Sequence, residues 1–210
     1  MQKIWIKICG ITREQDALAA AELGADAIGV VLYPPSPRAV EVDDIAAIVQ
    51  SLPEKVQVVA LFVDPEASLV EQALKTGLVD LLQFHGKESA EFCGQFDVPY
   101  MKALAVKPGS DLSAQFAQYG GAKYILLDSY DPHLPGGTGK TFDWQQVEQL
   151  PAALKARLVL AGGLNPANVA EAINRVCPFG VDVSSSVEAS KGIKDRSKMK
   201  SFIEGVKTRG

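Results

Sequence analysis

Short apolar runs alternate with amphipathic stretches from one end of the chain to the other. Brief apolar runs predict strands, whereas apolar residues three and four apart predict helices. The expected strands cover residues 3–9, 26–32, 56–63, 79–84, 99–105, 123–128, 157–161 and 179–183. The expected helices cover residues 13–23, 42–51, 66–75, 88–96, 111–118, 142–148, 166–175 and 195–206. The pattern therefore predicts eight β-α units in sequence.

Eight such units, at a mean spacing of about 26 residues, predict an α/β fold: a (β/α)8 TIM barrel with its active site at the carboxyl ends of the strands. The runs 27–32 and 158–161 are apolar throughout, which is typical of parallel strands buried on both faces. The alternative is an open doubly wound sheet, which usually has a G-x-G-x-x-G first turn that Cys9–Thr12 lacks. No linker or shift in composition marks a boundary, so one domain over residues 1–210 is expected.

Composition and charge narrow the classes of function. The chain has 210 residues, a formal net charge of −4 and no basic block, so no nucleic-acid partner is expected. No apolar run reaches transmembrane length and no signal segment is evident, so no membrane partner is expected and the location is predicted to be cytoplasmic. Three cysteines form no disulfide framework, and two histidines offer no metal-ligand spacing.

Two helix boundaries carry local signals. Thr12, with Gln15 three residues later, predicts a capping box at the start of the first helix. Gly24 follows the same helix, as a C-terminal cap does. The first helix is therefore expected to begin at residue 13 and to end at residue 23.

Polar residues gather where the predicted strands end, which is where barrels of this type place their active sites. They are Lys7, Cys9, Arg38, Asp64, Gln83, His85, Lys102, Asp128 and Asp182. Cys9 shares a strand face with Lys7, whose charge favours a thiolate that can act as base or nucleophile. The competing interpretation is a small core cysteine, because free Cys is among the most buried residue types.

Asp128 and Arg38 supply complementary chemistry. Asp128 ends an apolar strand, and a carboxyl at the barrel rim is a candidate general acid, with a loop cap as the alternative. Arg38 follows Pro37, which restricts its approach and suggests a carboxylate or phosphate partner, with a plain surface charge as the alternative. His85 is either part of this site or a satisfied rim histidine.

The last two strands carry a phosphate signature. Gly162 and Gly163 let backbone N–H groups approach a ligand closely, and Ser184 and Ser185 add hydroxyls. Loops after strands 7 and 8 form the usual phosphate site of TIM barrels, although a simple turn and a solvated loop are the plainer alternative. The stretch 136–141 looks like a nucleotide loop, but Leu134 stands where that motif needs glycine, so a mobile lid is expected instead.

Several of these blocks, in order along the whole chain, resemble the phosphoribosylanthranilate isomerases of tryptophan biosynthesis. The blocks are Lys7–Thr12, Ser36–Arg38, Leu61–Val63, Gln83–Gly86, Leu127–Asp128, Gly137–Trp144, Ala161–Leu164 and Val181–Ser185. The resemblance implies an Amadori rearrangement of N-(5′-phosphoribosyl)anthranilate, a small phosphorylated aminosugar, by general acid–base catalysis without metal or organic cofactor. The family contains monomers and homodimers, so either state is expected.

The resemblance also implies residue roles. It makes Cys9 the general base, Asp128 the general acid and Arg38 the ligand of the anthranilate carboxylate. Phosphate binding falls to Gly162, Gly163, Ser184 and Ser185, and further substrate contacts to Gln83, His85 and Asp182. Two departures stand out, Leu32 where the family often has an aromatic residue and Ser186 where it usually has glycine.

Other phosphosugar barrels are the alternatives. An indole-glycerol-phosphate synthase-like enzyme would need a catalytic Lys and Glu pair at strand ends. An epimerase-like enzyme would need metal-binding histidines and carboxylates. A non-catalytic phosphosugar-binding barrel would need no acid–base pair at all.

Overall fold

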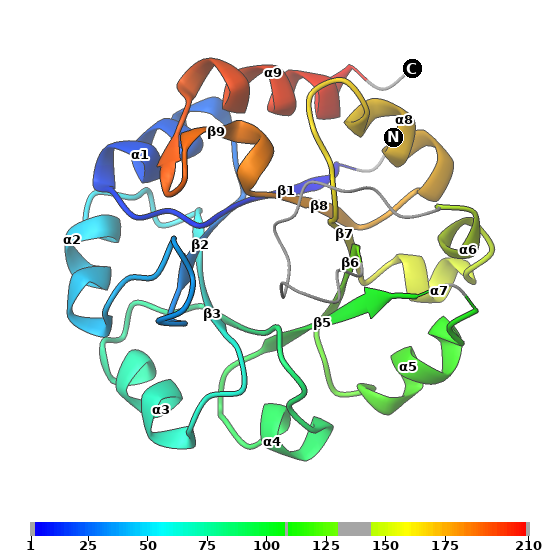
Figure 1. Ribbon diagram of the computed structural model, residues 1–210, viewed down its shortest axis with the longest axis horizontal. Coiled ribbons are helices and arrows are strands. Elements are labelled where there is room, and N and C mark those ends of the chain that lie inside the picture. Colours follow the sequence, from blue (N-terminus) through cyan, green and yellow to red (C-terminus); the bar gives the residue numbers. More distant parts are fainter. Residues whose placement is uncertain (1–2, 108, 130–143, 209–210) are drawn as a thin grey trace.

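The computed structural model describes residues 3–107, 109–129 and 144–208, and within them eight parallel strands close into a barrel (Figure 1). Each strand pairs with the next along the chain, and the last pairs with the first. The strands are β1 (Trp5–Cys9), β2 (Ala27–Val31), β3 (Gln57–Phe62), β4 (Leu81–Phe84), β5 (Tyr100–Val106), β6 (Tyr124–Ser129), β7 (Leu158–Leu160) and β8 (Gly180–Val183). The predicted TIM barrel is confirmed, and every strand lies where the apolar runs predicted it.

Helices form a ring around the strands (Figure 1). They are α1 (Glu14–Leu23), η1 (Val42–Asp44), α2 (Ile45–Val49), α3 (Ala67–Lys75), α4 (Ala90–Gly94), α5 (Leu112–Gln118), α6 (Gln145–Glu148), α7 (Ala152–Lys155), α8 (Val169–Val176) and α9 (Arg196–Lys207). The sequence pattern missed α7. After β8 the chain adds η2 (Ser185–Val187) and a small antiparallel pair, β9 (Glu188–Ser190) and β10 (Ile193–Lys194).

Alternation along each strand separates two apolar layers. On β1, Ile4, Ile6 and Ile8 belong to the outer layer between strands and helices. The inner layer fills the barrel with Trp5, Ala27, Val59, Leu81, Met101, Ala103, Leu126, Val159 and Ala161. Lys7 and Cys9 alternate with the isoleucines and share the other face of β1, as the sequence predicted. The structure shows that this face points into the barrel.

The start of α1 differs from the expectation. Its N-cap is Arg13, which makes no side-chain cap, and the predicted capping box at Thr12 is wrong. The Thr12 hydroxyl instead donates to the carbonyl oxygen of Gly192 at 2.6 Å, so it joins the β9–β10 turn to the first loop. The end of α1 is as expected, since Gly24 takes a left-handed conformation with φ 106°.

Lys102 also departs from the expectation. It follows Met101 on β5 and so lies on the outer face, where its Nζ contacts Glu88 rather than the barrel mouth. The predicted lid over 136–141 and the second histidine, His133, lie outside the described residues. Among the helices that the structure describes, none is long and apolar enough to cross a membrane.

Candidate active site

Cys9 lies at the carboxyl end of β1, inside the barrel. Its side chain is 6% exposed and packs with Val31 and Leu61 in a small apolar cluster at the mouth, flanked by Tyr33 and Val63. Leu32, the departure from the family pattern, belongs to the outer layer and does not line this mouth. Cys9 is therefore almost fully buried at the mouth.

Lys7 sits one layer below Cys9 and is completely buried. Its Nζ donates to Oδ1 of Asp182 on the neighbouring strand β8 at 3.0 Å. Burial works against the charged lysine, but Asp182 and Cys9 outweigh it and raise the pKa of Lys7. An ammonium group is thus kept charged inside the barrel.

Burial raises the pKa of the Cys9 thiol, because a thiolate is costly to form away from water. The charge of Lys7 acts in the opposite direction, Asp182 adds to the rise, and Lys7 also lowers the pKa through its hydrogen-bonding interaction with the sulfur. The expected help from Lys7 is therefore present, but it offsets only part of the burial effect.

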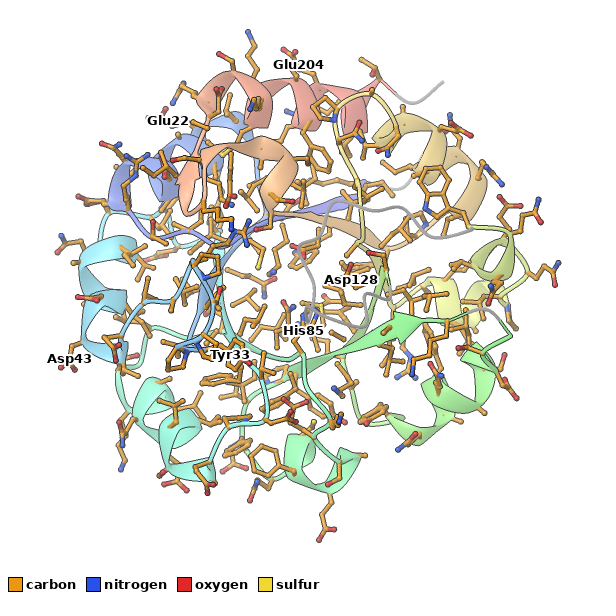
Figure 2. The ribbon with its side chains drawn as sticks, in the orientation of Figure 1. Glu22, Tyr33, Asp43, His85, Asp128 and Glu204 are labelled. Carbon is orange, nitrogen blue, oxygen red and sulfur yellow. The ribbon has the colours of Figure 1, made fainter. Side chains whose placement is uncertain are left out.

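Asp128 lies across the mouth on β6, and Figure 2 shows Asp128 and His85 both reaching toward the centre of the barrel. Its Oδ1 accepts a hydrogen bond from the backbone N–H of Ser129 at 2.7 Å. Its Oδ2 lies 3.4 Å from Nε2 of His85. The residue as a whole is 7% exposed, so its carboxyl group lies almost entirely among these neighbours.

Gln83 supports His85 from below. Its Nε2 lies 3.2 Å from Nδ1 of His85, and the Gln83 side chain is completely buried. Among the described residues, its Oε1 has no hydrogen-bond partner. A chain of polar groups thus runs from the barrel interior through the imidazole to Asp128.

A pocket opens beside Asp128 between the loops that follow β7 and β8. It is lined by Asp128, Ala161, Gly162, Gly163, Leu164, Asp182, Val183, Ser184, Ser185 and Ser186. Gly162 and Gly163 have φ of 74° and 69°, a left-handed conformation that favours glycine. The pocket thus brings the predicted phosphate residues and the predicted acid together.

Ser186 ties the two loops of this pocket to each other. Its hydroxyl donates to the carbonyl oxygen of Leu164 at 2.6 Å. The glycine usual in the family could not make this bond. The departure therefore adds a cross-link at the rim of the pocket.

Arg38 reaches the same rim from the loop after β2. Its Nε and Nη2 donate to the two carboxylate oxygens of Glu188 at 2.7 and 2.8 Å, and these bonds raise the pKa of Arg38. Lys194 donates to the same carboxylate at 2.8 Å. Burial favours neutral Glu188, but hydrogen bonds from Arg38 and Lys194 dominate and lower its pKa. Two cations around one anion leave this corner with a net positive charge.

Gly10 connects this corner to the base. A Cβ placed on Gly10 would lie 2.4 Å from Cδ of Arg38 and 3.0 Å from Oγ of Ser184. The residue after Cys9 therefore touches both the predicted carboxylate ligand and the predicted phosphate loop. The mouth is one continuous site.

The sequence analysis did not name Glu188 or Gly29, although a Cβ placed on Gly29 would lie 2.9 Å from Sγ of Cys9. Glu188 follows a serine-rich loop, and nothing in the pattern shows that it meets Arg38 across 150 residues. Gly29 did carry a signal, because a glycine inside a strand often marks a close approach of other groups. Among the described residues, no cluster of three or more His, Cys, Asp or Glu side chains could hold a metal ion.

The comparisons with known proteins agree with the fold and the motifs. A family model described as N-(5'phosphoribosyl)anthranilate (PRA) isomerase matches residues 6–205. A relative named N-(5'-phosphoribosyl)anthranilate isomerase from Pseudomonas paraeruginosa is 53% identical over 210 residues, which is 100% of this chain and 98% of that protein. A relative of the same name from Pseudomonas putida is 51% identical over 207 residues and 99% of both chains.

Solved structures give the same result. Phosphoribosyl anthranilate isomerase from Thermotoga maritima superposes with a TM-score of 0.86 at 39% identity, over 97% of this chain and 98% of that one. A second structure of such an isomerase, in complex with reduced 1-(o-carboxyphenylamino)-1-deoxyribulose 5-phosphate, has a TM-score of 0.82 at 38% identity, over 97% and 98% of the two chains. The resemblance inferred from the motifs is confirmed: this chain belongs to the N-(5'-phosphoribosyl)anthranilate isomerase family, and it is an isomerase of tryptophan biosynthesis.

Proposed function

We propose that residues 1–210 act as one catalytic domain that converts N-(5′-phosphoribosyl)anthranilate into 1-(2-carboxyphenylamino)-1-deoxyribulose 5-phosphate. The observation that carries the proposal is the shared mouth. Cys9 and Asp128 are both mostly buried at strand ends of one barrel, and the glycine and serine loops open beside Asp128. A general base, a general acid and an anion pocket are the three parts that this isomerisation requires.

The phosphate end of the substrate fits the pocket between the β7 and β8 loops. Gly162 and Gly163 present backbone N–H groups without Cβ obstruction, and Ser184 and Ser185 add hydroxyl donors. The nearby cations Arg38 and Lys194 make the rim favourable for a dianion. An anchored phosphate would hold the ribose across the mouth.

The anthranilate end fits the part of the site that Arg38 and the apolar cluster line. Arg38 uses Nε and Nη2 for Glu188, which leaves its remaining Nη1 donors for the anthranilate carboxylate. The apolar cluster of Val31 and Leu61, with Tyr33 beside it, suits the aromatic ring.

The chemistry then proceeds by two proton transfers. Asp128 gives its proton to the ribose ring oxygen, so the C1′–O bond breaks and a protonated Schiff base forms. The Cys9 thiolate removes the proton from C2′, and the electron pair moves toward the iminium nitrogen to give an enolamine. Tautomerisation of the enolamine yields the ketone. Each positioned acid or base of this kind contributes about 10²–10⁴-fold in rate.

His85 and Gln83 belong to the acid side. His85 contacts Asp128, and the completely buried Gln83 contacts His85, so we assign Gln83 to the substrate site only through the imidazole. Asp182 lines the pocket while its Oδ1 accepts from Lys7. Asp182 is therefore proposed to contact a ribose hydroxyl with its remaining carboxylate oxygen.

A fluorescence assay of the anthranilate adduct, with EDTA present, tests the proposal. The parent chain is expected to convert the adduct, and Cys9→Ala and Asp128→Asn are each expected to lose about 10²–10⁴-fold in kcat. Full activity in a folded Cys9→Ala variant would remove the base assignment. Loss of parent activity in EDTA would instead favour an epimerase-like, metal-dependent barrel. The cytoplasmic location and a monomeric or homodimeric state remain predictions.

A further inference from the structure

Lys7 is a charged side chain of the described part of the mouth to which the mechanism above gives no role. It is completely buried inside the barrel, where an ammonium group needs a strong reason to remain. Asp182 balances its charge at 3.0 Å, but a pair of apolar residues would fill the same space without any desolvation cost. A charged pair at this depth points to a role beyond packing.

The space around Lys7 shows what that role involves. On β2, Gly29 pairs with Cys9 in the sheet. A Cβ placed on Gly29 would lie 2.9 Å from Sγ of Cys9 and 3.0 Å from Nζ of Lys7. Gly29 does not have a left-handed backbone, so its conformation does not require glycine. Because Gly29 has no side chain, the sulfur of Cys9 and the ammonium group of Lys7 can both lie close to its Cα.

We propose that Lys7 is a positioning residue for the isomerisation, whose ammonium group, fixed by Asp182 and admitted by Gly29, stabilises the thiolate form of Cys9 that takes the C2′ proton. This rests on the proposed role of Cys9 as the base. Lys7 keeps its own proton throughout. When the sulfur takes the C2′ proton, the thiol forms and the charge of Lys7 is balanced by Asp182 alone.

Electrostatics supports this geometry. Burial raises the pKa of Cys9, and Lys7 provides the largest effect in the opposite direction. The other charged groups that face the thiol are Asp182 on β8, Lys194 on β10 and, through the loop after β2, Arg38. Lys194 and Arg38 share Glu188, so their charges are partly neutralised, whereas Lys7 is directed at the sulfur.

The test compares Lys7→Met with the parent by the pH dependence of kcat and by direct titration of the thiolate, followed by its ultraviolet absorbance. Both would be done in a Cys177→Asn background, because Cys177 is exposed and its left-handed backbone, φ 53°, tolerates Asn. Removing the ammonium group should move the alkaline rise of kcat and the thiolate titration together to higher pH. At neutral pH kcat should fall by about tenfold or more and recover as the pH increases.

Lys7→Met leaves Asp182 buried without a partner, so a second variant keeps the test conclusive. Lys7→Gln with Asp182→Asn preserves a hydrogen-bonded pair of similar size without either charge. It should show the same direction of shift, because Lys7 affects the thiol more than Asp182 does. Lys102→Met is the control for losing a buried lysine at a site away from Cys9, and the titration of Cys9 should not move in it.

A uniform loss of kcat at every pH, with the thiolate titration unchanged in both Lys7 variants, would overturn the proposal and leave Lys7 as a structural residue. That result is distinct from failure of the base assignment, which would appear as activity retained in Cys9→Ala. A titration that moves in Lys102→Met as far as in Lys7→Met would also overturn it, because the shift would then follow from loosened packing rather than from the missing ammonium group.

Discussion

Two buried lysine–carboxylate pairs in this barrel have similar geometry, with a cysteine close to each, but they contact different groups. Inside the barrel, Lys7 donates to Asp182 at 3.0 Å, with Cys9 beside it. Outside, between strands and helices, Lys102 donates to Glu88 at 3.0 Å, with Cys93 nearby. Both lysines are almost completely inaccessible. The difference lies in which face of the strand each occupies.

The outer pair holds the backbone of two loops in place through hydrogen bonds. Glu88 accepts from the N–H groups of Asp64 and Gly86 at 2.8 and 3.1 Å. Lys102 donates to the carbonyl oxygens of Phe84 and Gly86 at 3.3 and 2.6 Å. These bonds fix the turns after β3 and β4, and so the approach of His85 to the mouth. The outer thiol, Cys93, is fully buried and has no route to a substrate.

Within the described part of the chain, the inner pair makes no hydrogen bond to a backbone group. The hydrogen bond that joins Lys7 to Asp182 ties β1 to β8, and its remaining neighbour is the thiol of Cys9. A lysine pair on the inner face therefore acts on chemistry, while one on the outer face acts on loop geometry. In a barrel, burial and ion pairing alone therefore do not reveal what a lysine does, because its role depends on which face of the strand it occupies.

Breaking either ion pair should give the largest decreases in the free energy of unfolding. Lys7→Met and Lys102→Met each leave a carboxylate buried without its partner, which typically costs about 3–5 kcal/mol. Urea unfolding followed by circular dichroism measures this as a lower midpoint with an unchanged slope. A variant within about 1 kcal/mol of the parent would mean that its carboxylate finds water or another partner.

Replacing both partners should separate the two pairs. Lys7→Met with Asp182→Leu removes both charges and leaves no backbone group unpaired, so stability should return close to that of the parent while activity stays low. Lys102→Met with Glu88→Leu orphans the N–H groups of Asp64 and Gly86, at about 1–3 kcal/mol for each. The same urea series measures both. Equal stability of the two double variants would contradict the conclusion that the outer pair, unlike the inner pair, satisfies backbone groups.

Gly29→Ala tests the inner site alone. The added methyl group would press on both Sγ of Cys9 and Nζ of Lys7, and overpacking of this kind costs about 1–3 kcal/mol. It should also lower kcat, because the thiol must move. Gly94→Ala is the matched control, since nothing lies within 4 Å of its added Cβ at the end of α4. That change should stabilise the chain by up to about 1 kcal/mol, with kcat unchanged.

The fold was predictable from local patterns because parallel strands buried on both faces have a strong signature. All eight strands lie where apolar runs such as 27–32 and 158–161 predicted them. The failures were local. Thr12 fits a capping box in sequence, but its hydroxyl bonds Gly192, a partner 180 residues away. The short helix α7 lacks enough turns to show a period.

Part of the candidate site was also predictable from the sequence. Cys9, Asp128 and the Gly162–Gly163 turn could be named as candidates because strand ends and glycine pairs are visible in the sequence, and the structure places all of them at the carboxyl ends of the strands. Lys102 was misplaced because its strand face was not assigned, although the alternation with Met101 and Ala103 contained that information. Glu188 could not be found, because its role depends on a contact with Arg38 across the closure of the barrel.

Ionisation of the two thiols, Cys9 and Cys93, should have the smallest effect, which is a decrease in the free energy of unfolding at alkaline pH. Burial raises the pKa of Cys93 from 9.0 to about 12, and burial also raises the pKa of Cys9. Below about 9 both the folded and the unfolded chain hold these protons, so the contribution to stability is complete. As the pH rises above 9, the unfolded chain releases protons that the folded chain keeps, and the free energy of unfolding falls.

One such proton changes the free energy of unfolding by at most about 1.4 kcal/mol per pH unit. Urea unfolding repeated at increasing pH measures the slope, and Cys93→Ala should flatten it without changing kcat. Tyr100 and Tyr119, whose pKa values burial also raises, keep part of the slope in every variant. Cys9→Ala should flatten the same slope and remove activity as well, so the two cysteines share their linkage to folding and differ in chemistry. A slope in Cys93→Ala equal to that of the parent would show that the outer thiol is not shielded from water in the folded chain.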